Sequence, residues 1–554
     1  MPHSFQPDIP TTSSNSLDTS SVISSVSSLS EDGLLHCKRE PSSQQQLRND
    51  TPNTSDNLYH QPSTADRQFS NSMTLPAPSH ARDSALESPL QVQATAEKEG
   101  ATSLTALPHI TRNAHATVQE QTQASRFRRL QLHWLTAYRL LIGLTLAINL
   151  AVLIAWLNTY LPLAGLLQAT STNLFVAVLI RQEDLLNASF FLLAKIPLRL
   201  PLRIRKTIAD FHHYGGFHIG CALSALMWYC VFVAANTIHT IKNVNRGNMT
   251  AWMWADIVTC YAFLTFILFI CVTAHPRLRV KFHNTFEHTH RFGGWAAILV
   301  LWINSGVGTK AQNADQPLYQ SPALWLLAAT TFLIILPWLR IRRVPIHAAL
   351  VSSREVKLTF PYPGMPYTST TRFSLSPLME WHAFATIPSD DGFTANIIIS
   401  QAGDWTRNLI KNPPQRIWIR KPATANFLAF TPVFNSVLLV ATGAGIGPML
   451  SLLQSPAVAK MKTEGRQVRV MWCVYDPDAP HWKFVQEVIR KVDPMPKIFD
   501  SKQGRPDVVF EAMYMKHACD IETVMVVSNK KVTDEVVREV KAHGGAAYGA
   551  VFDS

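Results

Sequence analysis

Six apolar runs, each about as long as a lipid bilayer is thick, constrain this chain more than any other feature. A helix that crosses a hydrocarbon core of about 30 Å needs roughly 20 residues. The runs lie near residues 134–157, 172–196, 212–238, 252–275, 288–306 and 322–339. The second run contains Arg181-Gln182-Glu183-Asp184, and ionisable groups at membrane depth are costly. That run therefore either starts in the outer interface or turns these side chains towards a polar interior. The sequence predicts a polytopic α-helical membrane bundle of six spans over residues 126–343.

The basic residues beside these runs predict the orientation. The net charge is −6 over residues 1–125, +14 over 126–343 and +4 over 344–554. Thirteen basic residues flank the runs on one side, and only Lys242, Arg246 and Lys310 lie on the other. The positive-inside rule then puts both termini in the cytosol. The overall charge of +12 is thus a topology signal and not a nucleic-acid-binding surface. We expect the plasma membrane as the location, with Asn248 as a glycosylation sequon in an outer loop.

The segments outside the bundle differ in composition. Residues 1–125 are rich in Ser, Thr, Gln and Pro, which predicts a disordered cytosolic tail. Residues 344–432 hold short alternating runs broken by Pro and Gly, which predict a cytosolic β-barrel. Residues 433–554 alternate buried strands with helices, which is typical of a doubly wound α/β domain. The seven cysteines show no metal-binding spacing.

A glycine-rich turn, Gly443-Ala444-Gly445-Ile446-Gly447-Pro448, follows the predicted strand 436–441 and opens a helix. At such a place, backbone N–H groups and the helix dipole attract a pyrophosphate, and glycines let the backbone approach it. Downstream, Gly504-Arg505-Pro506-Asp507 strengthens the interpretation as a nucleotide site. A purely structural tight turn is the alternative.

Three motifs resemble the ferric reductase and NADPH oxidase superfamily, whose cytosolic half is similar to ferredoxin-NADP reductase. Gly403-Asp404-Trp405-Thr406 resembles the G-D-W-T of its flavin domain, Trp381 to Thr386 its H-P-F-T, and Gly504 to Phe510 its G-R-P segment. The resemblance covers about residues 130–554. Segments 213–218, 289–292 and 547–554 are similar to TmpA-type fungal membrane proteins, a group linked to asexual development, and to the reductase-like tail of fungal adenylate-forming enzymes.

The resemblance implies two cofactors and the residues that hold them. For FAD these are His382, Phe384 and Thr386, with Trp405 and Thr406 on the following flavin strand. For NAD(P)H they are Gly443, Gly445, Gly447, Pro448, Gly504 and Arg505. Phe552 or Tyr548 is the candidate for the aromatic that covers the flavin ring, with core packing as the alternative. The pattern is altered at Ser400, at 421–424 and at 528–530, which makes loss of cofactor binding an alternative.

The superfamily also uses two haems, each held by two histidines on the third and fifth helices. His213 or His212 together with His290 implies at most one haem, on the inner side, and His218 is the best alternative ligand. Counting on 13 or 14 residues from these positions gives residues 225–227, 303 and 304, which include no histidine, so the outer haem lacks ligands. Interfacial histidines without metal are the alternative.

We therefore predict a membrane-bound flavin-dependent oxidoreductase that passes electrons from NAD(P)H through FAD to an unknown acceptor, in fungal developmental signalling (conidiation). Its expected partners are the lipid membrane, the nicotinamide nucleotide and that acceptor, with no nucleic acid. The first rival is a catalytically degenerate membrane receptor or scaffold with a reductase fold. A transporter is a weaker rival because it gives no reason for the three cytosolic motifs.

Overall fold

The computed structural model describes residues 130–132, 134–158, 162–311 and 317–550, which belong to one compact unit. The predicted tail 1–125 and Phe552 lie outside the described residues.

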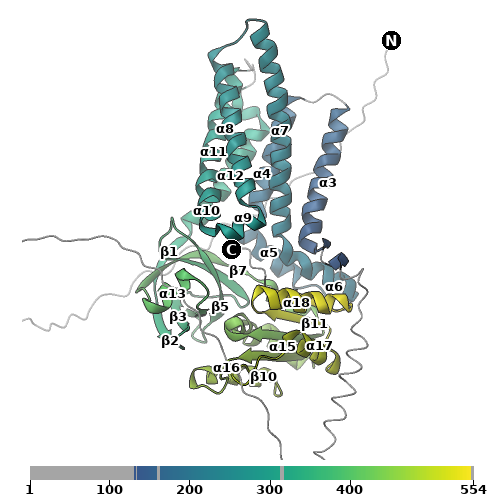
Figure 1. Cartoon of the computed structure of the whole chain (residues 1–554), viewed down its shortest axis with the longest axis vertical. Helices are drawn as coiled ribbons and strands as arrows, with labels where there is room; N and C mark the ends of the chain where they lie inside the picture. Colours follow the sequence, from purple (N-terminus) through teal and green to yellow (C-terminus); the bar gives the residue numbers. More distant parts are fainter. Residues whose placement is uncertain (1–129, 133, 159–161, 312–316, 551–554) are drawn as a thin grey trace, which may run out of the picture. The chain divides into compact units, whose positions relative to one another are not determined.

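Long apolar helices make up the first half of the described chain (Figure 1). They are α3 (Ala137–Leu157), α4 (Leu163–Leu179), α5 (Glu183–Leu193), α7 (Gly215–Asn245), α8 (Ala251–Thr273), α11 (Gly294–Ala311) and α12 (Pro322–Leu339). Shorter elements connect them: α6 (Leu202–Ala209), η1 (Asp210–His213), α9 (Pro276–Lys281), α10 (His283–His288), η2 (Thr289–Gly293) and η3 (Leu318–Gln320). Among the described residues, five helical segments are long and apolar enough to cross a membrane, and the bent pair α4 and α5 is the sixth candidate.

The second predicted span is broken where its polar residues lie. Helix α4 ends at Leu179, α5 begins at Glu183, and the two axes differ by 68°. Glu183 and Asp184 occupy the first turn of α5, where the helix dipole favours negative charge. The polar run is thus a helix boundary rather than the middle of a straight span.

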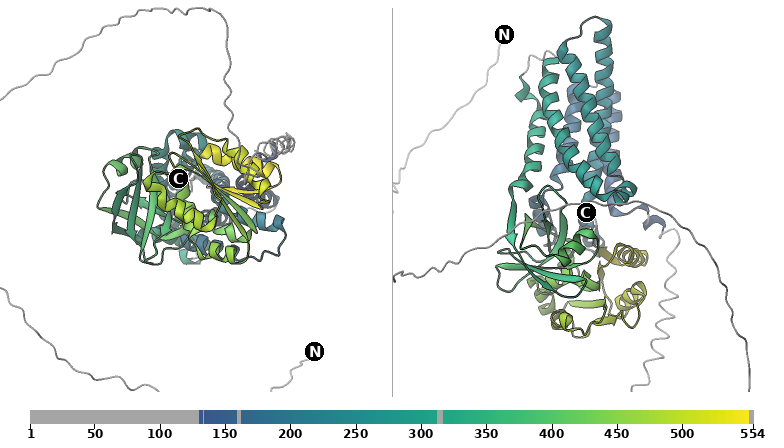
Figure 2. Two further views of the ribbon diagram at one scale, coloured as in Figure 1. Left: turned by 90° about the horizontal axis from the view of Figure 1, so that it is seen from below. Right: turned by 60° about the vertical axis from the view of Figure 1, so that its left-hand side comes forward.

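Close backbone approach joins α3 to α7. A Cβ at Gly216 would lie 2.6 Å from the carbonyl oxygen of Tyr138, and one at Gly220 would lie 2.7 Å from the Cβ of Thr145. Large buried side chains of α7 contact both neighbours: Trp228 Nε1 donates to Asn149 of α3 at 2.8 Å, and the ring of Tyr229 lies 4.6 Å from that of Phe263 of α8. The right-hand view of Figure 2 shows the long helices running side by side.

An antiparallel sheet of seven strands follows the last long helix. Its strands are β1 (Ile341–Pro345), β2 (His347–Leu350), β3 (Glu355–Pro361), β4 (Ser369–Ser374), β5 (His382–Pro388), β6 (Thr394–Ser400) and β7 (Arg416–Ala425), in the order β1-β7-β4-β5-β6-β3-β2. Burial alternates along β3 and β6, so one face of the curved sheet carries the core. The predicted strands near 355–360, 381–387 and 394–400 are confirmed, and the sheet begins at Ile341, just before the expected boundary at 344.

A parallel sheet of five strands forms the C-terminal part. It consists of β8 (Ser436–Thr442), β9 (Gln467–Val474), β10 (Lys497–Asp500), β11 (Thr523–Val527) and β12 (Ala546–Gly549), in the order β10-β9-β8-β11-β12. Helices α14 (Ile446–Leu453), α15 (Pro456–Thr463), α16 (Lys483–Val492), α17 (Val508–Ala518) and α18 (Lys530–Ala542) connect the strands. All five residues of β11 are buried, as expected for a strand covered on both faces. The predicted doubly wound α/β domain is confirmed.

Candidate functional site

The glycine turn lies at the point where the order of the parallel strands reverses. Strands β8 and β11 are neighbours in the sheet but far apart in sequence, and ligands of doubly wound sheets bind at the carboxyl ends of such strands. The hydroxyl groups of Thr442 and Ser528, which end these two strands, lie 2.6 Å apart. The carbonyl oxygen of Gly443 accepts a hydrogen bond of 3.0 Å from Trp472 Nε1, which fixes the turn to β9. The turn therefore occupies the position that a nucleotide site requires.

Two glycines of this turn meet different surroundings. A Cβ on Gly445 would lie only 2.3 Å from the carbonyl oxygen of Val527, whereas one on Gly447 would lie 3.9 Å from Ile398 Cβ. Gly443 has a φ of +52°, which favours glycine. Pro448 lies in the first turn of α14, where its missing N–H costs little. The sequence therefore holds glycine at 445 because β11 leaves no room for a side chain.

Arg505 lies near the carboxyl end of β9. Burial raises the pKa of the Cys473 thiol, and the positive charge of the nearby Arg505 partly offsets this rise. Gly504 before it has a φ of +141°, which a side chain would disfavour. Asp507 accepts hydrogen bonds of 3.0 Å from the backbone N–H groups of Val509 and Phe510 and so caps α17. The G-R-P segment thus places a cation beside the carboxyl ends of the central strands.

The predicted flavin residues of β5 share one face of the strand. His382, Phe384 and Thr386 follow each other at intervals of two, so their side chains point the same way. The Thr386 hydroxyl lies 2.8 Å from Ser369 Oγ and is buried. The ring centroids of His382 and Phe384 lie 4.3 Å and 5.8 Å from that of Trp405. Three of the predicted residues therefore share one face of β5, and Trp405 contacts the first two of them.

Trp405 and Thr406 do not lie on a strand, as the sequence analysis expected. They begin helix α13 (Asp404–Lys411), which follows β6. The reason is local: Thr406 Oγ1 accepts hydrogen bonds from the N–H groups of Ala402 (2.8 Å) and Gly403 (3.0 Å) and closes the first turn. The strand prediction for these two residues is wrong, but the helix keeps Trp405 over β5.

Two buried polar atoms beside this cluster have no hydrogen-bond partner among the described residues. They are Trp405 Nε1 and Thr371 Oγ1. Thr371 pairs in register with Phe384, whose ring stacks on Trp405. A buried polar group without a partner costs about 1–3 kcal/mol, and a polar cofactor at this place would supply partners. The residues present therefore fit a flavin.

A single hydrophobic core joins the glycine turn to the flavin strand. Ile387 at the end of β5 is buried together with Ile446 and Met449 of α14. The nucleotide turn and the flavin strand are thus held as neighbours, which hydride transfer between two cofactors requires.

The predicted haem histidines separate into two groups. The rings of His212 and His213 lie 3.9 Å apart on η1, whereas His290 lies 6.1 Å from His218, at an angle of 79°. Burial lowers the pKa of His212 to about 4 and that of His213 to about 3, so both imidazoles are neutral at physiological pH. The structure thus brings His290 together with the alternative ligand His218, while His213 packs against His212.

Asn304 stands where the outer haem would need a histidine. Its amide nitrogen donates to Asp256 Oδ1 and Thr259 Oγ1, both at 2.9 Å. Asn236 donates to the other carboxylate oxygen of Asp256 at 2.8 Å. These polar contacts tie α7, α8 and α11 together.

Tyr548 packs in a core rather than over the flavin strand. Its side chain is 2% exposed, its hydroxyl donates to the carbonyl oxygen of Lys206 at 3.1 Å, and its ring lies 5.6 Å from that of His212. Burial also raises the pKa of Tyr548. The structure gives Tyr548 the packing role that the sequence left open as the alternative, and Phe552, which lies outside the described residues, stays a prediction for the flavin cover.

Asn248 is exposed in the turn between α7 and α8, and its N–H donates to the carbonyl oxygen of Asn243 at 3.0 Å. A sugar at this position would meet no buried surface.

Sequence reasoning missed the contacts between the bent helix pair and the antiparallel sheet. The carboxylate of Glu183 accepts hydrogen bonds from Arg420 (2.5 Å) and Arg372 (3.2 Å) and is 3% exposed. Asn187 donates to the carbonyl oxygen of Ala423 at 2.9 Å and accepts from the N–H of Ala425 at 2.8 Å. Charged and amide side chains inside an apolar run indicated that this run has polar partners. The partners themselves could not be predicted because they lie more than 180 residues away in the sequence.

A second joint lies between α6 and the parallel sheet. Arg205 donates to both carboxylate oxygens of Glu522, at 2.7 Å and 3.0 Å, and to the carbonyl oxygen of Val433. Bidentate pairs of this kind are among the stronger ion pairs because two parallel hydrogen bonds fix the geometry.

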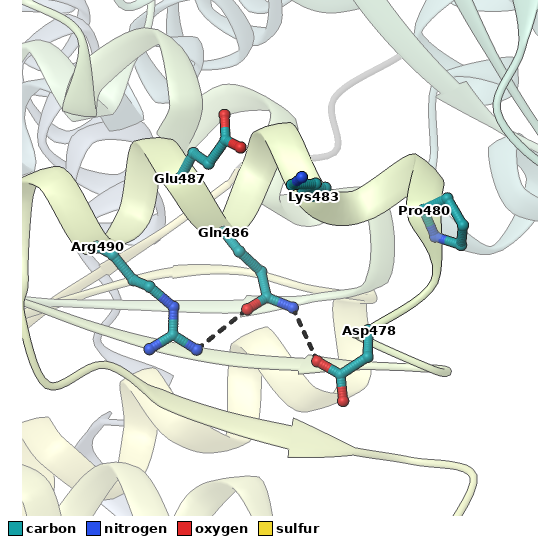
Figure 3. A pocket seen from close by; sticks show the side chains of 6 residues that line it. All are labelled: Asp478, Pro480, Lys483, Gln486, Glu487 and Arg490. Carbon is teal, nitrogen blue, oxygen red and sulfur yellow. Dashed lines mark hydrogen bonds between the residues drawn. The ribbon is translucent and has the colours of Figure 1, made fainter.

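An open surface pocket beside α16 contains none of the predicted site residues. Its lining is Asp478, Pro480, Lys483, Gln486, Glu487 and Arg490. Gln486 donates to Asp478 at 3.3 Å and accepts from Arg490 at 3.1 Å, as Figure 3 shows. Because these polar groups satisfy one another, we assign the site to the glycine turn and β5 instead.

The chain is similar to adenylate-forming reductases of a fungus. Residues 427–554 match the family of the C-terminal domain of Adenylate-forming reductase 03009. Adenylate-forming reductases 03009 and 06235 of Coprinopsis cinerea are 33% and 34% identical to the chain over 446 and 450 residues, which is 78% and 79% of its length. The chain spans 42% of each of these relatives. It is thus similar to reductases that are considerably longer than itself.

A plant protein extends the similarity. Ferric reduction oxidase 8, mitochondrial, of Arabidopsis thaliana is 26% identical over 277 residues, 45% of this chain and 36% of that protein. The predicted resemblance to the adenylate-forming reductases is confirmed, and a weaker one to a ferric reduction oxidase accompanies it. The resemblance to TmpA-type proteins stays a prediction.

Solved structures with low identity also align. A ferredoxin NADP+ reductase from Neisseria gonorrhoeae with bound FAD and NADP is 14% identical, over 38% of this chain and 98% of that one, with a TM-score of 0.31. A flavohemoglobin from Malassezia yamatoensis with bound FAD and heme is 14% identical, over 76% and 99%, with a TM-score of 0.34.

Proposed function

We propose that the chain is a membrane-bound oxidoreductase that takes electrons from NAD(P)H through FAD and passes them to an acceptor near the membrane. The observation that carries the proposal is the placement of the glycine turn. It lies at the switch point of the parallel sheet and shares a core with the strand that bears His382, Phe384 and Thr386. The names of the fungal and plant relatives, which are reductases and an oxidase, support the same reaction class.

The residues divide between the two cofactors. Gly443, Gly445 and the first turn of α14 present backbone N–H groups to a pyrophosphate, and Arg505 adds a positive charge nearby. On the other side, Trp405 Nε1 and Thr371 Oγ1 offer a donor and a hydroxyl to the flavin. When bound, FAD accepts a hydride from the nicotinamide and releases electrons one at a time. The contribution of the chain is to hold the two cofactors in contact and to exclude water between them.

Exposed apolar stripes support a membrane location. Leu140, Leu144 and Ile148 follow each other at intervals of four on α3 and are 51%, 55% and 56% exposed. Water would make such a stripe costly, at about 25 cal/mol per Å² of apolar surface. Exposed Trp252 and Trp254 at the start of α8 and Trp325 near the start of α12 are typical of a membrane interface. We propose that both termini are cytosolic and that the plasma membrane holds the chain.

The pairing of His218 and His290 supports one haem at the inner side. His218 Nδ1 lies 2.8 Å from the carbonyl oxygen of Ala177, and an imidazole held in this way keeps Nε2 for a metal. The ring centroids of His218 and His290 lie 6.1 Å apart, so these two imidazoles are the ones that would hold a haem iron. The residues therefore fit a haem as a third cofactor.

Trp405→Phe tests the flavin site because it removes Nε1 and keeps the aromatic ring. We expect the FAD content of the purified full-length chain to fall several-fold, in line with the about 1–3 kcal/mol that one hydrogen bond to a charged or buried group contributes. The measurement is the amount of FAD released per protein. Trp418→Phe on β7 is the matched control and should keep its flavin. Equal flavin content in both variants would remove Trp405 from the site.

A receptor or scaffold without chemistry is the second candidate. It is favoured by Ser400 and Ser528, which replace residues of the family pattern, and by the direct contact of Ser528 with Thr442 across the switch point. A chain of this kind would carry no FAD. The role in fungal developmental signalling stays a prediction under both candidates.

A further inference from the structure

Asp210, His212 and His213 form a cluster of metal-ligating side chains on the turn η1. Their ligand atoms all lie within 4.8 Å of one another. In a 3-10 helix, residues three apart eclipse each other, so Asp210 and His213 lie on the same face. A single turn thus brings one carboxylate and two imidazoles together, separate from the pair formed by His218 and His290.

The imidazole of His212 is fixed in a ligating orientation. Its Nδ1 donates to the carbonyl oxygen of Ala209 at 2.7 Å, which leaves the lone pair on Nε2. Its ring lies 5.6 Å from that of Tyr548 and 6.1 Å from that of Phe427, and 7% of the residue is exposed. Within the described residues, no hydrogen bond involves the ring nitrogens of His213. Two imidazole nitrogens are therefore available beside the carboxylate of Asp210.

We propose that this cluster binds a divalent first-row transition metal ion of the zinc type. The ligands are His212 Nε2, a ring nitrogen of His213 and the carboxylate of Asp210, and water completes the coordination. Two imidazoles and one carboxylate suit such an ion, and three protein ligands with an open position are a common arrangement. All three protein ligands come from the single turn η1, so the ion would fix the conformation of that turn.

Lys541 is the residue that competes with the metal. Its ammonium group bonds to Asp210 Oδ1 at 3.1 Å and lies 5.3 Å from the ring centroid of Tyr548. The side chains of Lys541 and Asp210 are 25% and 29% exposed, so each can reach water when the pair opens. A metal ion bound to Asp210 would weaken the ion pair between Asp210 on η1 and Lys541 on α18. Removal of the Lys541 ammonium group should therefore strengthen metal binding.

The experiment uses the full-length chain in detergent, stripped of metal with a chelator, and radioactive Zn²⁺ as the probe in equilibrium dialysis. We expect one tight site per chain. Asp210→Asn and His213→Gln should each weaken it at least about tenfold, as the loss of even an outer partner of a metal ligand does. Lys541→Gln should tighten it several-fold. The chain has 20 histidines, so a control has to show that the loss of an unrelated one leaves zinc binding unchanged. His347→Ala, which removes an exposed histidine, is that control.

Two results would overturn the site. Zinc bound equally by the wild type, Asp210→Asn and His213→Gln would show that other histidines hold it. Weaker binding in Lys541→Gln would show that the ammonium does not compete at Asp210. The FAD content of each variant, measured in the same samples, reports folding and keeps this test separate from that of the flavin site.

Discussion

Gly445→Ala is expected to impair reduction of the flavin by NADPH strongly. The added methyl group would lie 2.3 Å from the carbonyl oxygen of Val527, so either the glycine turn or the end of β11 has to move. Such overpacking costs about 1–3 kcal/mol or more. The displaced element carries Ser528 or the N–H groups of the turn, and we expect NADPH binding to weaken by at least about tenfold, which corresponds to ~1.4 kcal/mol. Stopped-flow absorbance of the flavin after mixing with NADPH measures this loss.

Gly447→Ala is the matched comparison for that variant, because it adds the same methyl group in the same turn but keeps the backbone N–H that Gly447 presents to the pyrophosphate. Its methyl group would lie 3.9 Å from Ile398 Cβ, which is an ordinary contact distance. We expect the rate of flavin reduction and the melting temperature to stay close to those of the wild type. If Gly445→Ala reacts with NADPH as well as Gly447→Ala does, the nucleotide does not depend on this turn.

Glu183→Gln is expected to loosen the joint between the bent helix pair and the antiparallel sheet. The substitution keeps the shape of the side chain but leaves Arg372 and Arg420 without their shared carboxylate. Loss of one partner from a buried ion pair costs about 3–5 kcal/mol. The side chains of Arg372 and Arg420 are 39% and 24% exposed, so water compensates part of the loss and the lower end of that range applies. Thermal unfolding of the detergent-solubilised chain and limited proteolysis at the joint measure the effect.

Asp184→Asn provides the comparison at the neighbouring position. Asp184 pairs with Arg340, but its side chain is 56% exposed, and exposed pairs contribute about 0–1 kcal/mol. We expect a small change in stability and an unchanged protease pattern. Equal behaviour of the two variants would mean that Glu183 does not hold the joint.

Local patterns in the sequence predicted the strands and the glycine turn well, for physical reasons. Residues 437–441 of β8 and 524–527 of β11 are all apolar because both faces of a parallel sheet are covered. The turn at 443–448 is marked by glycines because the backbone itself has to come close to its neighbours. The polar run at 181–184 indicated that the second span is not a straight apolar helix, and a bend separates α4 from α5 at this place.

Local sequence patterns did not predict the contacts between residues that are far apart in the sequence. Glu183 and Arg420 are 237 residues apart, and no local pattern connects them. The helix at 404–411 was missed because the motif around Trp405 suggested a strand, while the hydroxyl of Thr406 closes a helical turn. The pairing of His290 with His218 instead of His213 follows from the 3-10 turn that precedes α7, which spacing alone did not reveal.

An anaerobic titration of the purified full-length chain with NADPH, followed by its absorbance spectrum, tests the central proposal most directly. We expect about one FAD per chain, whose absorbance is bleached by NADPH in the wild type and in Gly447→Ala, whereas Gly445→Ala needs a clearly higher NADPH concentration for the same bleaching. A chain that holds no flavin, or a flavin that neither NADPH nor NADH reduces, would contradict the oxidoreductase and favour a receptor or scaffold built on the same fold.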